Sequence, residues 1–262
     1  MWKKGFHSFN MVDISPWPLL GSLSAWVLAL GLVSFFWGQG VFLSLFGVCL
    51  LSIVSIQWWR DVIREGTYCG LHTSSVCKSL YLGVIMFIAS EVMFFFSFFF
   101  GFFFVSLSPD VGLYCSWPPM GIEPLSCFSV PLFNTLLLLS SGVSITWAHH
   151  AIMSGKLREG IVGLVTTIIL GVVFLYVQLK EYFETMFCLM DSVFGSLFFL
   201  MTGFHGLHVL VGLLFIIVSA WRMSAFHFSL EHNVGFEVCA WYWHFVDVVW
   251  LFLFVVVYWW GG

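Results

Sequence analysis

The feature that most constrains this chain is its succession of long apolar runs. A helix needs about 20 mostly apolar residues to cross a bilayer. Runs of that kind predict seven spanning helices, at residues 17–36, 41–57, 80–107, 130–153, 161–179, 193–220 and 238–260. Because 61% of the residues are hydrophobic and only 8% are charged, there is too little polar surface to coat a soluble globule. The sequence therefore predicts an all-α membrane protein with seven transmembrane helices.

Lysine and arginine predict how the chain is oriented. If the N-terminus lies on the inner side, seven spans place Lys180 alone on the outer side. All other basic residues then fall on the inner side: Lys3, Lys4, Arg60, Arg64, Lys78, Lys156, Arg158 and Arg222. Such a bias is typical of inner loops, so the C-terminus is expected outside. The outer loops are expected to be acidic, with Asp110, Glu123, Glu181, Glu184 and Asp191.

The spacing of the runs predicts three regions. The connection around residues 38–40 is very short, so the first two helices should form an antiparallel hairpin. We expect an N-terminal entry and hairpin at 1–57, an inner-side linker at 58–79 and a five-helix bundle at 80–262. The second helix is expected to continue out of the membrane into the linker.

The linker begins with Trp58, Trp59 and Arg60, and Arg64 follows one helical turn later. Tryptophan is typical of the membrane interface. Arg60 and Arg64 share one helix face at headgroup level, which suits the phosphates of anionic lipids. Ordinary interfacial anchoring, without a specific lipid, explains the same residues.

Glu91 is a carboxylate inside an apolar run. At 1.5 Å per residue it lies about 20 Å deeper than Lys78 on a continuous helix, well inside the hydrocarbon. Since an unpaired carboxylate there is very costly, we expect Glu91 to be protonated or hydrogen-bonded to a neighbouring helix. It suits a proton relay or a lipid contact, and a purely structural hydrogen bond is the alternative.

The last apolar run carries a polar stripe. On a helix of 3.6 residues per turn, Trp241, His244 and Asp247 fall within about a quarter turn of Glu237. Hydrocarbon does not tolerate such a stripe, so it is expected to face other helices. His205 and His208, three residues apart, also share one helix face.

The residues do not predict a reaction centre in this chain. His205 with His149 or His244 could in principle ligate a haem, but nothing marks any two of them as a facing pair. The seven cysteines form no C-x-x-C motif, which argues against zinc. No phosphate-binding loop, nucleophile elbow or nucleic-acid stripe is found. We therefore expect no catalytic residue, metal or nucleic-acid partner. A stand-alone proton or small-solute transporter, using Glu91 and the stripe of Glu237, His244 and Asp247, remains the alternative.

Motifs spread over nearly the whole chain resemble the cytochrome c oxidase subunit III family. The longest is Trp241-Tyr-Trp-His-Phe-Val-Asp-Val-Val-Trp-Leu-Phe-Leu-Phe254, which is followed by Tyr258-Trp-Trp-Gly261. Other similar segments, in the family's order, are Val12–Leu19, Trp58–Glu65, Ser90–Phe95, Ser141–His150 and Thr202–His208.

The resemblance implies seven transmembrane helices, with helices 1–2 separated from helices 3–7 by a V-shaped cleft that holds phospholipid. It implies a non-catalytic core subunit of an oxidase that moves electrons from cytochrome c to O₂ and pumps protons. Haem and copper are expected in partner subunits I and II, with subunit I as the main contact and accessory subunits nearby. Supporting subunit I, proton uptake and oxygen access are the expected roles.

The resemblance also implies roles for particular residues. Glu91 matches an intramembrane glutamate that reacts with hydrophobic carbodiimides. The positions expected near lipid headgroups, together with the interfacial tryptophan, are Trp59, Arg64, Glu65, His72, Arg222 and His227. The sequence shows no removable signal peptide or basic presequence. Its high content of Phe, Val, Gly, Trp and Cys suggests a compositionally skewed organelle genome. A mitochondrially encoded chain of the inner membrane is therefore expected, with the N-terminus on the matrix side. A bacterial relative is the lesser alternative.

Overall fold

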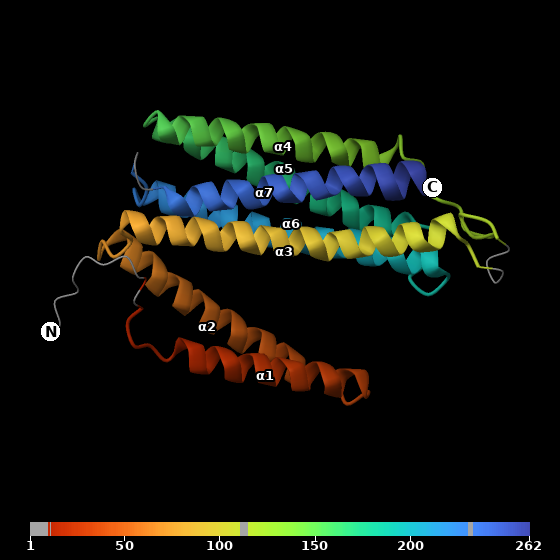
Figure 1. The fold of residues 1–262 in the computed structure, drawn as a ribbon, viewed down its shortest axis with the longest axis horizontal. Coiled ribbons are helices and arrows are strands. Elements are labelled where there is room, and N and C mark those ends of the chain that lie inside the picture. The colour runs from red at the N-terminus through yellow and green to blue at the C-terminus, as the bar shows by residue number, and fades with distance from the viewer. Residues whose placement is uncertain (1–9, 11, 111–114, 230–232) are drawn as a thin grey trace. The chain divides into compact units, whose positions relative to one another are not determined.

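The structure, a computed structural model, describes residues 10, 12–110, 115–229 and 233–262. These residues form seven helices that are long and apolar enough to cross a membrane (Figure 1). They are α1 (Trp17–Phe36), α2 (Phe42–Thr67), α3 (Ser74–Leu107), α4 (Val130–Met153), α5 (Leu157–Glu184), α6 (Val193–Ser224) and α7 (Val234–Leu253). A π-helical segment, η2 (Phe254–Trp260), continues α7. Because the described residues include no strand, the predicted all-α class with seven transmembrane helices is confirmed.

Helices α1 and α4 begin and end at the predicted residues. Each has a proline in its first turn, Pro18 and Pro131, where the missing N–H has no helical partner to lose. Gly38 and Gly155 stand just beyond the helix ends with φ of +74° and +72°. This left-handed conformation ends a helix and is easily adopted only by glycine.

The other helices are longer than their apolar runs. Helix α2 continues past Gln57 to Thr67, so the predicted extension is confirmed. Helix α5 reaches Glu184, which corrects one assignment: Glu181 does not lie in an acidic outer loop. It stands inside α5 and only 2% of it is exposed, because partners on other helices allow α5 to continue through a polar residue.

The chain divides into two compact units, Met1–Leu80 and Tyr81–Gly262. In the first unit, α1 and α2 pack against each other as the predicted hairpin. Glycines allow this close approach, since a Cβ on Gly31 would lie 2.4 Å from the Ser44 nitrogen and one on Gly47 would lie 2.6 Å from Leu28 Cα. The cleft expected between helices 1–2 and 3–7 stays a prediction.

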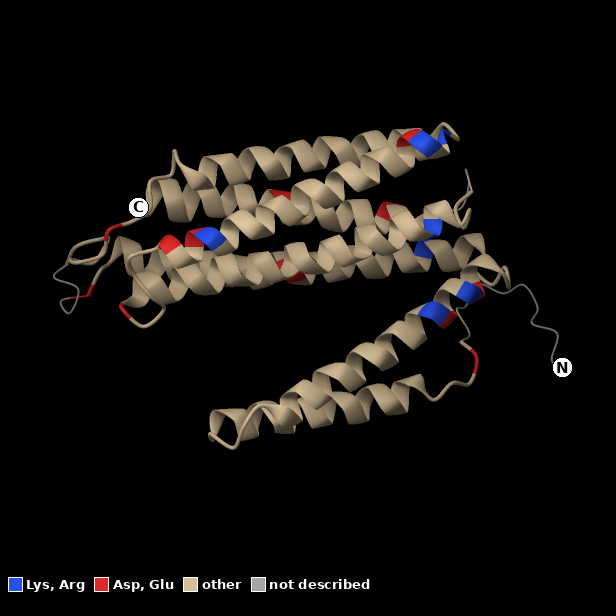
Figure 2. Cartoon of the chain, turned by 180° about the vertical axis from the view of Figure 1, so that it is seen from behind, with Lys and Arg blue, Asp and Glu red and all other residues tan. Residues whose placement is uncertain are grey.

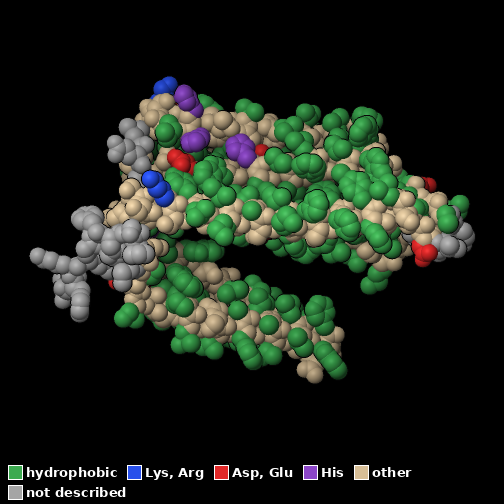
Figure 3. All heavy atoms as spheres, in the orientation of Figure 1, with side chains coloured by type: hydrophobic (Ala, Val, Ile, Leu, Met, Phe, Trp, Pro, Cys, Tyr) green, Lys and Arg blue, Asp and Glu red, His purple; other side chains and the backbone are tan. Residues whose placement is uncertain are grey.

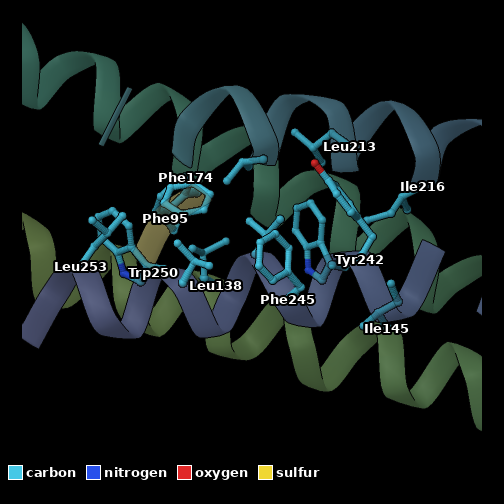
Figure 4. Close-up of a cluster of buried hydrophobic side chains, with 14 of the residues drawn as sticks. Phe95, Leu138, Ile145, Phe174, Leu213, Ile216, Tyr242, Phe245, Trp250 and Leu253 are labelled. Atoms are coloured by element: carbon cyan, nitrogen blue, oxygen red, sulfur yellow. The ribbon is translucent and has the colours of Figure 1, made fainter. Parts of the chain in front are cut away.

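The second unit contains the main core. Helix α4 packs on α5 and α7, and α6 packs on both α5 and α7. Large aromatic side chains fill the space between them, with Trp243 and Trp250 almost fully buried and Phe95 entering from α3. Figure 4 shows these side chains converging from several helices. Since lipid tails are as apolar as the core, tight van der Waals packing rather than escape from solvent stabilises such a bundle.

The outer surface of the second unit is mostly apolar (Figure 3). Large side chains such as Phe100, Phe104 and Val143 are strongly exposed on α3 and α4. A surface of this kind suits lipid and not water, which agrees with a multi-pass membrane protein.

Lysine and arginine in the second unit lie near the helix ends, whereas some acidic residues lie within the helices (Figure 2). Arg158 and Lys180 stand near opposite ends of α5, as the predicted alternation of basic residues requires. Lys3 and Lys4 lie outside the described residues. The assignment of one end to the inner side of the membrane stays a prediction.

Candidate functional site

Glu91 and His208 form an ion pair or hydrogen bond between α3 and α6. His208 Nε2 lies 3.0 Å from Glu91 Oε2, and the side chains are 10% and 21% exposed, respectively. Aromatic rings surround the imidazole, including Phe95 at 5.0 Å between ring centroids and a stacked Tyr242 at 6.4 Å. The predicted hydrogen bond from Glu91 to a neighbouring helix is therefore present.

The geometry of the Glu91–His208 pair determines how many protons it holds. His208 Nδ1 lies 2.7 Å from the Phe204 carbonyl oxygen, which can only accept, so Nδ1 carries a hydrogen. The 3.0 Å contact on the other side needs one further proton, carried by Nε2 or by the Glu91 carboxyl. The pair can thus hold a transferable proton without a net charge inside the bundle.

The polar stripe of the last helix, here called the α7 stripe (Glu237, Trp241, His244 and Asp247), is partly buried. Tyr81 of α3 donates a hydrogen bond to Glu237 Oε2. Asp247 is 6% exposed and packs against α4, where its Oδ2 lies 2.7 Å from the place a Cβ on Gly142 would take. Its Oδ1 is buried with no hydrogen-bond partner among the described residues.

The rest of the α7 stripe is open to the outside, which corrects the expectation that all of it faces helices of this chain. The His244 side chain is 46% exposed and Trp241 is 37% exposed. His244 makes only long contacts, 3.9 Å to Asp247 Oδ2 and 3.5 Å to Thr146 Oγ1. Figure 3 shows histidine side chains on an otherwise hydrophobic face. The α4 residues closest to His244 are the small Gly142 and Thr146, so the described helices of the second unit leave much of its side chain exposed.

His205 and His208 share a helix face but not their surroundings. His205 is 1% exposed and lies between the rings of Phe174 and Trp250, at 5.8 and 5.2 Å between centroids. Both of its ring nitrogens lack a hydrogen-bond partner among the described residues. His205 therefore points into the bundle, whereas His208 faces α3.

The histidines considered for a haem differ in their surroundings. His149 packs on Phe236 at 5.6 Å between ring centroids, His244 lies beside Asp247, and His205 lies between two aromatic rings. In the described ranges, no three His, Cys, Asp or Glu side chains come together in a way that could hold a metal ion.

Arg64 borders a hollow at the base of the first unit. The hollow is lined by Val12, Asp13, Ile14, Ser15, Trp17, Trp58, Asp61, Val62, Arg64, Glu65 and Cys69. Asp61 accepts hydrogen bonds from Trp17 at 2.7 Å and from Arg60 Nη2 at 3.0 Å. Arg64 Nη1 is 4.0 Å from Asp61, and its side chain is 59% exposed. Arg60 is thus paired with Asp61 more closely than Arg64 is, which leaves Arg64 better placed to meet an anion.

The other predicted lipid-contact residues are spread over both units. Trp59 is exposed on α2, whereas Trp58 lines the hollow. Glu65 also lines the hollow, and His72 packs on α2, its Nδ1 2.7 Å from the place a Cβ on Gly66 would take. No role of these residues follows from their positions alone.

Arg222 and His227 stand at the end of α6 in the second unit. The Arg222 guanidinium lies 4.6 Å from the Phe228 ring centroid, and its Nη1 approaches Gly235 near the start of α7. The His227 ring packs on Trp221 at 5.6 Å. Arg222 is therefore half-buried and joins the ends of α6 and α7, a structural role that the sequence did not indicate.

The sequence reasoning missed one buried cluster. Glu181 and Gln178 of α5, Asn134 of α4 and Tyr258 of η2 are joined by hydrogen bonds. The signal was present, since Gln178 and Glu181 are three residues apart on one helix face, while Lys180 and Glu184 pair with each other on the exposed face. Glu181 follows the end of an apolar run among other polar residues, and such a stretch resembles a loop when the sequence is considered alone.

Comparisons with known proteins agree over nearly the entire chain. The model of the family described as cytochrome c oxidase subunit III matches residues 7–262. Relatives named cytochrome c oxidase subunit 3 include that of Lumbricus terrestris, which is 55% identical over 255 residues, covering 97% of this chain and 98% of the relative. Those of Pisaster ochraceus and Branchiostoma lanceolatum are 53% and 52% identical over 256 residues, covering 98% of each chain.

Proposed function

Because this chain belongs to the cytochrome c oxidase subunit III family, we propose that it is a non-catalytic, lipid-binding core subunit of the oxidase. The relatives that carry this subunit's name align with 97% or more of this chain, which supports membership of the oxidase complex. In this role the chain stabilises subunit I and supports its proton uptake and oxygen access. The haem and copper centres that carry electrons from cytochrome c to O₂ belong to subunits I and II. Nothing in the comparisons favours a stand-alone transporter.

The open part of the α7 stripe is the observation that supports a subunit role most directly. The His244 side chain is 46% exposed at the middle of a helix that crosses the membrane. Polar groups facing hydrocarbon are costly, and they normally face protein or an aqueous cavity. We assign the cover to subunit I, whose helices would bring a hydrogen-bond partner to His244.

Replacing His244 with leucine tests this docking surface. His244→Leu removes the polar group without disturbing a close polar contact inside the chain, since its hydrogen-bond partner Thr146 Oγ1 is 3.5 Å away. Retention of the chain by the catalytic subunits in mild detergent should fall by roughly ten-fold, the effect of about 1.4 kcal/mol. Quantitative mass spectrometry of the purified complex measures that ratio.

Tyr176→Leu is the matched control, because Tyr176 is an exposed polar aromatic residue on α5 away from the α7 stripe. It should leave retention unchanged. Equal retention of the His244→Leu chain and the wild-type chain would refute docking through the α7 stripe.

Lipid binding is proposed at the membrane interface of each unit. In the first unit, Arg64 supplies the cation, and Trp59, Glu65 and His72 are the other residues proposed for the headgroup contact. In the second unit, Arg222 and His227 stand at the end of α6. An arginine near the surface attracts anionic headgroups, and the exposure of Arg64 beside a hollow supports a phosphate contact there.

The proposed location is the mitochondrial inner membrane, with the N-terminus on the matrix side. The seven spans put the termini on opposite sides, and the excess of lysine and arginine on one side supports this orientation. Glu91 is proposed to react with hydrophobic carbodiimides, and its proton-sharing contact with His208 supports that assignment.

A further inference from the structure

The buried cluster around Glu181 takes no part in the docking and lipid proposals. Glu181 Oε1 accepts a hydrogen bond from the Tyr258 hydroxyl at 2.7 Å. Gln178 donates from Nε2 to the same hydroxyl oxygen at 3.4 Å, and Asn134 donates from Nδ2 to Gln178 Oε1 at 3.2 Å. Three segments, α4, α5 and η2, thus meet through polar side chains. We call these four residues and His205 the Glu181 site.

The Glu181 site contains several buried polar atoms that nothing in the described chain satisfies. They are Glu181 Oε2, Asn134 Oδ1 and both ring nitrogens of His205. Glu181, Asn134 and His205 are each at most 2% exposed, so neither lipid nor bulk water reaches them. Buried polar atoms without a partner are costly and are rarely left so in native proteins.

Shared neighbours connect His205 with the rest of the site. The Trp250 ring packs on His205 at 5.2 Å and on Tyr258 at 5.9 Å between centroids, and its Nε1 donates to Thr135, next to Asn134. Figure 4 shows Phe174 and Trp250 close together beside this region. Tyr258 stands in η2, and short π-helical segments often occur at functional sites.

The charges around Glu181 favour the uncharged carboxylic acid. Tyr258 faces it from η2, His205 lies on α6, and α4 contributes only the neutral Asn134. On its own helix the ionisable neighbours are Tyr182 and Glu184. No lysine or arginine forms an ion pair with Glu181 in the described chain, and Lys180 is exposed and pairs with Glu184 at 3.4 Å. A buried carboxylate without a cation is very unfavourable.

The hydrogen-bonding pattern then matches water. Since Oε1 accepts from Tyr258, the proton belongs on Oε2, which becomes a donor. Asn134 Oδ1 is an acceptor, and a neutral imidazole offers one donor and one acceptor. Water accepts and donates in equal measure, and a buried water typically makes about three hydrogen bonds. We propose that the Glu181 site binds ordered water inside the bundle and holds Glu181 as a protonated carboxylic acid bonded to that water.

Infrared difference spectroscopy of the intact oxidase complex, exchanged between H₂O and D₂O, tests the protonated carboxyl. Glu181→Gln keeps an oxygen that accepts from Tyr258, so the chain should fold. The variant should lose one carboxylic-acid carbonyl absorption that the wild type shows. Glu184→Gln, one turn along α5 at an exposed carboxylate, is the matched control and should keep it. An unchanged carboxylic-acid region in Glu181→Gln overturns the proposal.

A second variant and a direct view of the water keep the test decisive if Glu181→Gln does not assemble. Tyr258→Phe removes the hydrogen bond to Oε1, so the same carbonyl absorption should shift to higher frequency. A band that does not move contradicts the assignment. A high-resolution structure of the complex should show water within hydrogen-bond distance of Glu181 Oε2 and Asn134 Oδ1, and finding both atoms bonded only to side chains overturns the water site.

Discussion

At the scale of single residues, one proton joins Glu91 to His208. The Phe204 carbonyl determines which imidazole nitrogen must carry a hydrogen, and the remaining contact can be made in two ways. Either the carboxyl is protonated and the imidazole is neutral, or both are charged. Both arrangements are neutral overall, and the rings of Phe95 and Tyr242 beside the imidazole place the pair in apolar surroundings.

Glu91→Gln tests this arrangement. A glutamine still bonds to His208, so the haem content of the oxidase should stay unchanged. Labelling by a hydrophobic carbodiimide should disappear at position 91, because such reagents add to a carboxylic acid in an apolar place. Peptide mass spectrometry locates the label, and Glu184→Gln, at an exposed ion-paired site, should have no effect. Labelling of the Glu91→Gln chain elsewhere with equal yield would contradict Glu91 as the reactive group.

Arg64 is the second residue whose role can be isolated. Arg64→Ala should lower the anionic phospholipid that stays with the complex, since one arginine at the interface contributes about 1 kcal/mol of attraction. Lipid extraction followed by mass spectrometry gives the amount per complex. Arg60→Ala is the control, because Arg60 is paired with Asp61 at 3.0 Å and should change it less. Equal lipid in wild type and Arg64→Ala would argue against a specific contact.

At the scale of the helices, two kinds of packing hold the chain together. The α1–α2 hairpin relies on glycine, with Gly31 and Gly47 allowing the backbones to touch. The α4–α7 bundle relies on buried aromatic rings such as Trp243 and Trp250, whose indole nitrogens donate to Ser141 and Thr135 of α4. Small residues matter in the hairpin because only they bring the backbones that close.

Gly47→Ala tests the hairpin. The added methyl group would lie 2.6 Å from Leu28 Cα, so the two backbones must separate, at a cost of about 1–3 kcal/mol. Thermal denaturation of the complex, with detection of this chain's release, should show an earlier transition. Gly83→Ala has open space around its new Cβ and should be neutral or slightly stabilising. Equal effects of both substitutions would mean that the hairpin tolerates separation.

At the scale of the whole molecule, the second unit is apolar outside and carries Glu91 and Glu181 within its helices and a partly open polar stripe on α7. Exposed Phe100 and Val143 suit lipid, whereas the half-exposed His244 does not. Polar atoms at membrane depth need protein partners. The proposed docking on subunit I would supply one to His244.

The spectrum of the separated chain tests this view of the whole molecule. When the chain is stripped from the oxidase in mild detergent, the reduced-minus-oxidised haem spectrum should stay with the larger subunits. The separated chain should be colourless and should aggregate more readily than it does in the complex. Haem that travels with the separated chain would show that His205, with His149 or His244, ligates a haem and would contradict the expectation that this chain carries none.

Much of the fold was predictable residue by residue, and the misses have a common cause. The apolar runs alone located both ends of α1 and α4, and the proline in the first turn and the glycine beyond the end of each helix agree with those bounds. Glu181 was assigned to a loop because the residues around it are polar, as loop residues often are. Its hydrogen-bond partner Tyr258 is 77 residues away and cannot be inferred from that stretch. The pairing of Glu91 with His208 spans 117 residues, so depth in the membrane predicted a partner without naming it.

The sequence by itself determined the class of the molecule, the seven spans and the family, because length, apolarity and motif order are properties of local stretches. Only the tertiary structure decided that His208 and not His205 meets Glu91, that Glu181 is buried, and that half of the α7 stripe is left uncovered. Those outcomes depend on how each helix is rotated against its neighbours. Helix rotation is decided by side-chain packing across the bundle, which no single stretch of sequence contains.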